Sequence, residues 1–193
     1  MNDITRLRHF VTDFTALLDD VGTDEPQVFE RGAPLLARLV AVDDWLPATF
    51  AEPDPLRYRQ YLLHCDPYQR FSVVSFVWGP GQHTPVHDHT VWGMVSVLRG
   101  LERCEEFVFD TVANTLRKTG EHLMNPGQVD RVSPRIGDIH RVSNAVPDGP
   151  SVSIHVYGAN IGPLQRHVYE ETGGERHTFI SGYSSALMPN LWR

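Results

Sequence analysis

The sequence predicts a mostly β protein, an antiparallel sandwich or barrel with helices at its N-terminal end. The chain has 193 residues, which suits one domain with a substantial core. From about residue 58 onward, short β-rich runs are separated by Gly, Pro, Asn and Asp, with no helix-length crossover between them. Many short strands at this spacing are typical of an antiparallel sandwich or barrel and argue against a parallel sheet.

Two amphipathic helices are predicted ahead of the strands. Over 3–20, apolar residues recur at spacings of three and four, and Gly22 follows at the expected stop. A second helix is predicted over about 33–42, with Pro34 in its first turn. We expect both helices to pack on the barrel. One domain, 1–193, would then contain a helical part (1–50), the β-barrel (58–170) and a C-terminal extension (171–193).

The β-rich runs are short and mostly bounded by turn residues. Turn signals include Gly79-Pro80-Gly81 and Pro147-Asp148-Gly149-Pro150. The predicted strands are 58–65, 71–78, 84–89, 92–98, 102–109, 115–119, 128–133, 139–143, 151–157 and 166–170.

Charge and composition narrow the classes of partner. The net charge is −7, which argues against nucleic acid as the main partner. No apolar run reaches membrane-spanning length, and the first residues lack the apolar core of a signal peptide. Cys65 and Cys104 do not make a disulfide framework. These features predict a cytoplasmic protein that does not bind membranes, and they leave its oligomeric state open.

The most informative stretch contains His87-Asp88-His89. On an extended strand, side chains two residues apart point to the same face, so both histidines can reach one metal ion while Asp88 points away. A third ligand must come from elsewhere in the chain. His140 is the best candidate, and Asp138 beside it either supports the ligands or serves its own turn.

Two motifs around these histidines resemble those of a known family. The stretch from Gly81 to Gly100, with its His-x-His pair, resembles the first cupin motif, and Pro134 to Asn144, with His140, resembles the second. The usual first motif carries a glutamate ligand four residues after its second histidine, where this chain has Gly93. The resemblance therefore narrows to the three-histidine thiol dioxygenases, the cysteine dioxygenase family.

This resemblance implies a fold and a cofactor. The fold is the cupin double-stranded β-helix, a jelly-roll barrel, with the metal inside its mouth. Three neutral imidazoles also suit catalytic zinc, so the ligand count alone does not choose the metal. The resemblance favours Fe(II) as the cofactor, with a small thiol and O2 as the substrates.

A polar row follows on the strand over 151–157. Ser153, His155 and Tyr157 alternate with apolar residues and so lie on one face. A buried polar row has to be hydrogen-bonded, and a purely structural network would satisfy that need. The row also resembles the Ser-His-Tyr relay of the thiol dioxygenases, which implies a catalytic role for all three residues, with the Tyr157 hydroxyl directed at the substrate.

Two departures from the family bear on chemistry and substrate. Animal-type members link a cysteine to the active-site tyrosine. Gly93 stands at that position and Cys104 does not fit the pattern, so Tyr157 should be unmodified. Cysteine-specific members grip the substrate carboxylate with an arginine where this chain has Gln60. This resembles the bacterial members that favour 3-mercaptopropionate and implies that Arg166 contributes near the carboxylate.

The resulting hypothesis is a mononuclear non-haem iron thiol dioxygenase that converts a small thiol carboxylate, with 3-mercaptopropionate favoured, to its sulfinic acid. Cysteine is the alternative substrate. Other possibilities are a cupin that acts on carbon and a cupin that binds a ligand without catalysis. The missing motif glutamate counts against the first, and the three histidines count against a non-metal storage protein.

Overall fold

The computed structural model describes residues 4–171 and 175–192. Its helices are α1 (Thr5–Val21), α2 (Glu25–Val40) and the short 3-10 helix η1 (Ala48–Phe50). Its strands are β1 (Arg59–Cys65), β2 (Ser72–Trp78), β3 (Val86–His87), β4 (Gly93–Arg99), β5 (Glu102–Asp110), β6 (Thr115–Met124), β7 (Val129–Val132), β8 (Ile139–Asn144), β9 (Ser151–Tyr157), β10 (Arg166–Tyr169) and β11 (Arg176–Phe179).

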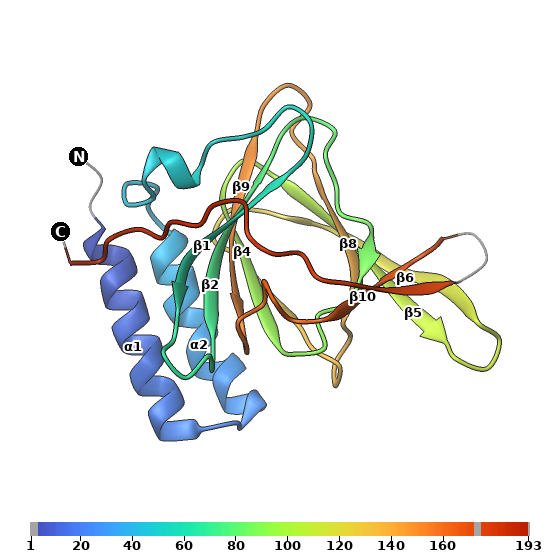
Figure 1. Ribbon diagram of the computed structural model, residues 1–193, viewed down its shortest axis with the longest axis horizontal. Helices are drawn as coiled ribbons and strands as arrows, with labels where there is room; N and C mark the ends of the chain where they lie inside the picture. Colours follow the sequence, from blue (N-terminus) through green and yellow to red (C-terminus); the bar gives the residue numbers. More distant parts are fainter. Residues whose placement is uncertain (1–3, 172–174, 193) are drawn as a thin grey trace.

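The strands form two sheets. One has the order β1-β2-β9-β4-β7 and the other the order β11-β10-β3-β8-β5-β6, and the pairings between these strands are antiparallel. In Figure 1, α1 and α2 lie side by side against the first sheet, and the second sheet lies on the other side of it. This arrangement confirms the predicted mostly β fold with N-terminal helices packed on it.

The first sheet is covered on both faces. All residues of β2 and β9 are buried, as a strand between a helical layer and a barrel interior requires. On the outer face the helices and the sheet share one hydrophobic core, which includes Phe14, Leu36 and Ile154. Helix α2 approaches β4 closely, because a Cβ at Gly32 would lie 2.9 Å from the terminal carbon of Met94.

Helix α2 begins eight residues before its predicted start at residue 33, since its first residue is Glu25. The Asp24 side chain caps it by accepting a hydrogen bond from the Gln27 amide, and Pro26 occupies the first turn. Pro34 lies inside the helix, not at its start. Because proline has no N–H, the carbonyl four residues before Pro34 lacks its helical hydrogen bond. Pro34 is exposed, so water can bond to that carbonyl instead. The prediction was wrong here because Pro34 was interpreted as a start signal.

The remaining differences concern strand length. Strand β6 runs to Met124, beyond the predicted 115–119. Its pairing with β5 continues past Gly120, where the register shifts between Glu106 and Phe107 without ending the strand. Strand β3 covers only Val86–His87 within the predicted 84–89. Strand β11 lies in the predicted C-terminal extension and pairs with β10.

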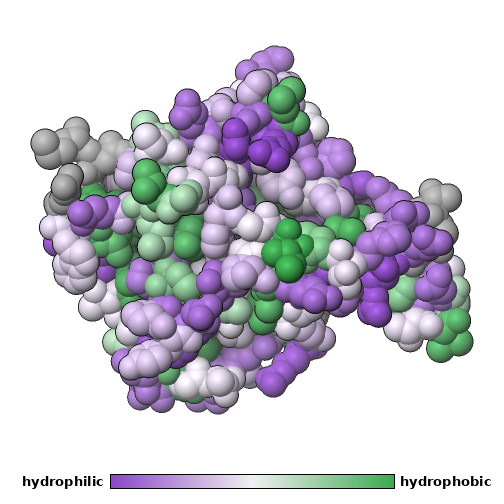
Figure 2. Space-filling model, in the orientation of Figure 1, coloured by the Kyte–Doolittle hydropathy of each residue, from purple (hydrophilic) through white to green (hydrophobic). Residues whose placement is uncertain are grey.

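The segment after β11 folds back over the first sheet. Its Ser184 amide donates to the Gln60 carbonyl, and the Gln60 amide donates to Ser184 Oγ. Leu191 then packs on the hydrophobic core of the helices. Figure 1 shows this dark red segment crossing β1 toward α1, and Figure 2 shows hydrophilic and hydrophobic side chains interspersed over the same face. Among the described residues, no helix has the length and apolar character needed to cross a membrane.

Candidate metal centre

Three histidines meet between the two sheets because of local backbone features. His87 lies in β3 and pairs in register with His140 of β8. His89 lies beyond the end of β3, where Thr90 takes a positive φ of 61° and turns the chain. The strand predicted over 84–89 therefore ends early, at His87, but His87 and His89 turn to the same side as expected while Asp88 bonds elsewhere. The imidazoles still converge, with ring centroids 4.8 Å apart for His87–His89 and His89–His140, and 4.9 Å for His87–His140.

Each imidazole has its Nδ1 engaged and its Nε2 left for another partner. The Nδ1 atoms lie 3.1 Å from the Pro85 carbonyl for His87, 2.8 Å from Asp138 Oδ1 for His89 and 3.5 Å from Cys104 Sγ for His140. Nε2 of His89 is fully buried and has no hydrogen-bond partner among the described residues. A buried nitrogen without a partner is costly unless it binds something, and three buried imidazoles that converge in this way suit a divalent metal.

The protonation state of the ligands also fits a metal. Burial, reinforced by the neighbouring imidazoles, lowers the pKa of His87 well below its usual value and that of His140 to about 3. Neutral imidazole is the form that binds metal ions. One ligand atom from each of the three residues lies within 4.8 Å of the other two, and all three residues are buried.

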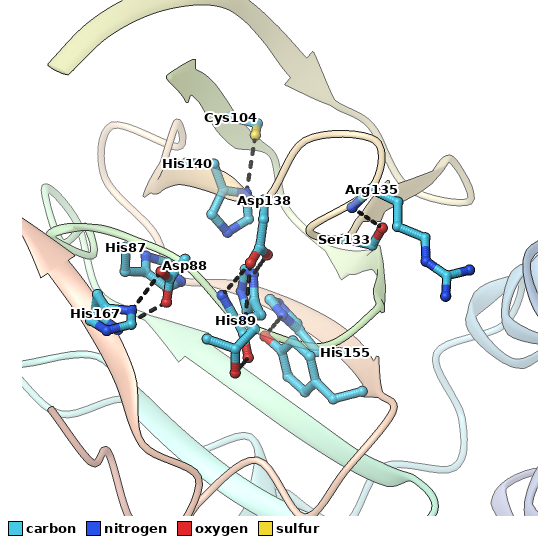
Figure 3. Close-up of polar contacts among 12 residues, drawn as sticks. His87, Asp88, His89, Cys104, Ser133, Arg135, Asp138, His140, His155 and His167 are labelled. Carbon is cyan, nitrogen blue, oxygen red and sulfur yellow. Dashed lines mark hydrogen bonds and ion pairs between the residues drawn. The ribbon is translucent and has the colours of Figure 1, made fainter. Parts of the chain in front are cut away.

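Asp138 fixes the orientation of His89. Its carboxylate accepts hydrogen bonds from His89 Nδ1 at 2.8 Å, from the His89 amide at 3.0 Å and from the Thr90 amide at 2.9 Å (Figure 3). Burial acts to raise the pKa of Asp138, but the hydrogen bonds from His89 and Thr90 leave that pKa below its usual value. The carboxylate therefore holds the proton on Nδ1 and aims Nε2 at the metal position. Of the two roles that the sequence left open for Asp138, support of a ligand is the one observed.

The predicted polar row on β9 forms a continuous chain of hydrogen bonds. Ser153 Oγ lies 2.8 Å from His155 Nε2, and His155 Nδ1 lies 2.8 Å from the Tyr157 hydroxyl. All three side chains are buried, and the Tyr157 ring stacks on His89 with centroids 5.2 Å apart. Burial lowers the pKa of His155 and raises that of Tyr157, so both are neutral at physiological pH.

Gly93 lies directly against Tyr157. The two residues are register partners on β4 and β9, and a Cβ on Gly93 would lie 2.9 Å from Tyr157 Cδ1. The sequence placed Gly93 where animal-type members carry their linking cysteine, and the register is consistent with that placement. Cys104 instead lies beside His140, consistent with the view that it does not match the family pattern.

The two predicted substrate-binding residues meet through the C-terminal segment. Gln60 Nε2 donates to Ser181 Oγ at 2.8 Å and also to the Gly182 carbonyl, and Arg166 donates to the same Ser181 Oγ at 2.6 Å. Gln60 points inward, whereas Arg59 pairs outside with Asp54. The expected alternation of Arg59 and Gln60 is therefore confirmed.

Arg166 is a buried cation without an anionic partner. The residue is 3% exposed, its Nε has no hydrogen-bond partner, and none of the ion pairs among the described residues includes it. Burial lowers the pKa of its guanidinium, against the opposing influence of Tyr157 and Tyr58. A buried guanidinium without an ion-pair partner is costly unless an anion joins it, so the surroundings of Arg166 suit a ligand carboxylate.

Sequence reasoning missed two clusters that link distant strands. The Asp88 carboxylate accepts hydrogen bonds from the His167 amide and from His167 Nδ1 (Figure 3). It also accepts one from the Tyr169 hydroxyl, and together these contacts tie β10 to the segment after β3. Cys104, His122 and Asp130 form a second group of potential metal ligands, beside a cavity of about 480 Å³. Neither group has a short sequence spacing that could have revealed it.

The fold and the site together define a class, and comparison with known proteins defines the family. Three buried imidazoles that could hold a metal ion lie between the two sheets of an antiparallel barrel, the arrangement of a cupin with a candidate metal site. The family described as "Cysteine dioxygenase type I" matches residues 33–170, more than half of the chain. The chain therefore belongs to this family. This confirms the predicted family and the predicted class of enzyme, a thiol dioxygenase.

Individual relatives are more distant. The chain is 28% identical to "Cysteine dioxygenase type 1" of Rattus norvegicus over 166 residues, covering 84% of this chain and 79% of that protein. It is 27% identical to "Cysteine dioxygenase type 1" of Homo sapiens over 164 residues, with the same coverage. A solved structure of an uncharacterized conserved protein with a double-stranded beta-helix domain from Klebsiella pneumoniae is similar, with a TM-score of 0.48, 16% identity and coverage of 63% of this chain and 94% of that one.

Proposed function

We propose that the protein is a mononuclear non-haem iron enzyme that oxidises a small thiol carboxylate to its sulfinic acid with O2, with 3-mercaptopropionate as the favoured substrate. Family membership supports the reaction type, and the unpaired Arg166 is the single observation that carries the substrate class. A cytoplasmic location belongs to the same proposal.

The proposed iron ligands are the Nε2 atoms of His87, His89 and His140. Their buried, neutral imidazoles supply three donors and leave the charge of a divalent ion uncompensated, which suits an anionic substrate. Fe(II), when bound, supplies the redox chemistry that places both atoms of O2 on the substrate sulfur. The family favours iron over zinc, which the same ligands would also accommodate.

Arg166 is proposed to bind the substrate carboxylate. Its guanidinium is buried and its Nε has no hydrogen-bond partner among the described residues. It donates to the neutral hydroxyl of Ser181 and lies over the Phe179 ring, 4.6 Å from the centroid, and neither contact neutralises its charge. A guanidinium binds a carboxylate through charge-assisted hydrogen bonds, which are about twice as strong as neutral ones. The amide of Gln60 is occupied by Ser181 and Gly182, so its donors contribute to holding the C-terminal segment in place.

The surroundings of Arg166 favour a substrate without an ammonium group. The groups that raise the pKa of Arg166 include Tyr157, Tyr58 and the carboxylate of Asp88. Asp88 already accepts its hydrogen bonds from His167 and Tyr169. The ammonium of cysteine would therefore enter beside a buried cation with no free carboxylate in this group, whereas 3-mercaptopropionate brings only the carboxylate.

Tyr157 is proposed to act on the bound substrate through its hydroxyl, with His155 and Ser153 holding it in place. The His155 contact restricts the hydroxyl, and stacking on His89 places the phenol ring beside a metal ligand. We expect Tyr157→Phe to bind metal normally and to lose turnover by about 10²-fold, a typical contribution of a positioned proton donor. Unchanged turnover would remove this relay from the mechanism.

The experiment compares O2 consumption by the Fe(II)-loaded protein with 3-mercaptopropionate, cysteine and 2-aminoethanethiol, which lacks a carboxylate. We expect kcat/KM to be highest for 3-mercaptopropionate and lowest for 2-aminoethanethiol. Faster turnover of cysteine would keep the reaction and overturn the substrate preference. Equal turnover of 2-aminoethanethiol would contradict the role of Arg166.

A further inference from the structure

The far end of the β9 hydrogen-bond row meets a buried carboxyl group that neither the sequence nor the family singled out. Glu102, the first residue of β5, is 0% exposed. Neither of its oxygens has a hydrogen bond of standard geometry among the described residues, yet the Ser153 and Ser151 hydroxyls and the Trp78 indole are close enough to influence its pKa. Ser153 therefore links the surroundings of Glu102 to the row, because its Oγ lies 2.8 Å from His155 Nε2 and accepts from the Trp78 indole at 3.4 Å.

The groups around Glu102 are neutral. Those that act on its carboxyl group from β9 and β2 are hydroxyls and an indole, and its register partners are Met124 of β6 and Asn144 of β8. On its own strand, Arg103 follows Glu102 but is exposed and pairs with Glu121, so it does not face the carboxyl group. Cys104, on the same strand face as Glu102, keeps its proton because burial raises the pKa of its thiol. Among the described residues, no cation pairs with Glu102, so the neutral acid is favoured over a charged carboxylate.

The protonation of Glu102 determines which way the hydrogen bonds of the row run. His155 is neutral and has one N–H, so one of its nitrogens donates and the other accepts. If Glu102 is a neutral acid, Ser153 donates to Nε2, the proton stays on Nδ1, and Nδ1 donates to the oxygen of Tyr157. The Tyr157 proton is then free to point at the substrate.

A charged Glu102 reverses this order. A carboxylate is the stronger acceptor, so Ser153 turns its proton toward it. Nε2 of His155 then has to donate to Ser153, and Nδ1 has to accept from Tyr157. The Tyr157 proton is now held within the row and is withdrawn from the substrate.

We propose that Glu102, a buried neutral acid at the start of β5, is a positioning residue that directs the hydrogen bonds of Ser153, His155 and Tyr157 to the substrate. Burial raises the pKa of Glu102 to about 8, which agrees with a neutral acid at physiological pH. The expected effect of Glu102 on turnover rests on the proposed function. The expected effect on the tautomer of His155 does not depend on that function.

The direct test is the tautomer of His155, followed by nitrogen-15 NMR in the full-length, metal-free protein as pH rises. We expect the proton on Nδ1 at neutral pH and its transfer to Nε2 as pH passes about 8. In Glu102→Gln, whose amide is neutral and donates at every pH, we expect Nδ1 to stay protonated throughout. A His155 tautomer that is the same in both proteins over the whole range would overturn the inference.

The kinetic test uses the Fe(II)-loaded protein with the thiol that wild type turns over best. We expect kcat of wild type to fall as pH rises through about 8, and kcat of Glu102→Gln to keep the low-pH value without this fall. Glu102→Leu, which cannot donate, should lose roughly five- to tenfold in kcat at all pH values with KM unchanged. An identical alkaline fall in Glu102→Gln and wild type would contradict the inference.

A matched control separates this role from the general loss of a buried acid. Glu25 is also a buried glutamate and accepts a hydrogen bond from Ser133 Oγ at 2.6 Å, but it belongs to α2. We expect Glu25→Gln to keep the wild-type pH profile and His155 tautomer. Absence of thiol oxidation in wild type would refute the proposed function, while the NMR result would still decide the role of Glu102.

Discussion

Replacing Asp138 by asparagine tests how the protein prepares His89 for a metal. The aspartate carboxylate accepts from His89 Nδ1 with one oxygen and from the amides of His89 and Thr90 with the other. An asparagine offers one acceptor oxygen and one NH2 group, so it cannot reproduce both sides. We therefore expect Asp138→Asn to weaken metal binding.

The size of the effect follows from the two orientations of the amide. If the NH2 group faces the His89 and Thr90 amides, two hydrogen bonds are lost, at about 1 kcal/mol each. If it faces His89 Nδ1, it stabilises the tautomer with the proton on Nε2, which cannot bind a metal. Both orientations agree with a loss of roughly 10- to 100-fold in metal affinity, or about 1.4–2.7 kcal/mol.

The assay is competition for Zn(II) or Fe(II) between the protein and a chromophoric chelator. Asp66→Asn is the matched control, because Asp66 is also buried and accepts hydrogen bonds from backbone amides, but in the β1–β2 turn. We expect Asp66→Asn to lower stability without changing metal affinity. Wild-type affinity in Asp138→Asn, or an equal loss in the control, would refute the reasoning.

Three further predictions follow from contacts around the site and the sheet. Arg166→Gln should raise KM for the thiol carboxylate by about 10- to 100-fold while metal affinity stays unchanged, because a charged hydrogen bond of about 1.5–3 kcal/mol is lost; steady-state kinetics decide this. Gly93→Ala should lower the free energy of unfolding by about 1–3 kcal/mol and reduce turnover, because its Cβ would lie 2.9 Å from Tyr157; denaturant titration measures the first effect. Hydrogen bonds from Arg70 lower the pKa of Asp66 in the folded protein, so the ionised carboxylate stabilises the fold. This contribution to the free energy of unfolding is complete above pH 3.8, the ordinary pKa, and disappears as pH falls through the lowered pKa. The free energies of unfolding of wild type and Asp66→Asn, measured over a range of pH, test this dependence.

Each of these has an outcome that would contradict it. An unchanged KM in Arg166→Gln would mean that the carboxylate is bound elsewhere. A Gly93→Ala protein with wild-type stability would mean that Tyr157 shifts without cost. A difference in stability between wild type and Asp66→Asn that persists at the acid end of the titration would mean that its source is not the carboxylate.

Features carried by short spacings were predictable from the sequence. The metal-ligand candidates followed from His-x-His and a second motif, and the row on β9 followed from the alternation of Ser153, His155 and Tyr157. The fold class followed from strand length and turn residues. These signals are local, so a single sequence contains them.

Features that depend on contacts between distant strands were not predictable. Ser181 joins Gln60 to Arg166 across more than a hundred residues, and nothing near any of the three residues indicates it. Glu102 lies in a strand of mixed polarity, where its burial depends on which face turns inward. Helix α2 was shortened in prediction because Pro34 is equally compatible with a first turn and an exposed interior position.

The most direct test of the central claim is the origin of the oxygen atoms in the product. The Fe(II)-loaded protein is supplied with 3-mercaptopropionate and O2 labelled with oxygen-18, and the mass of the product is measured by mass spectrometry. We predict a sulfinic acid that carries both labelled atoms, with one sulfinate formed for each O2 consumed. A disulfide product, or a sulfinate with oxygen from unlabelled water, would contradict thiol dioxygenation.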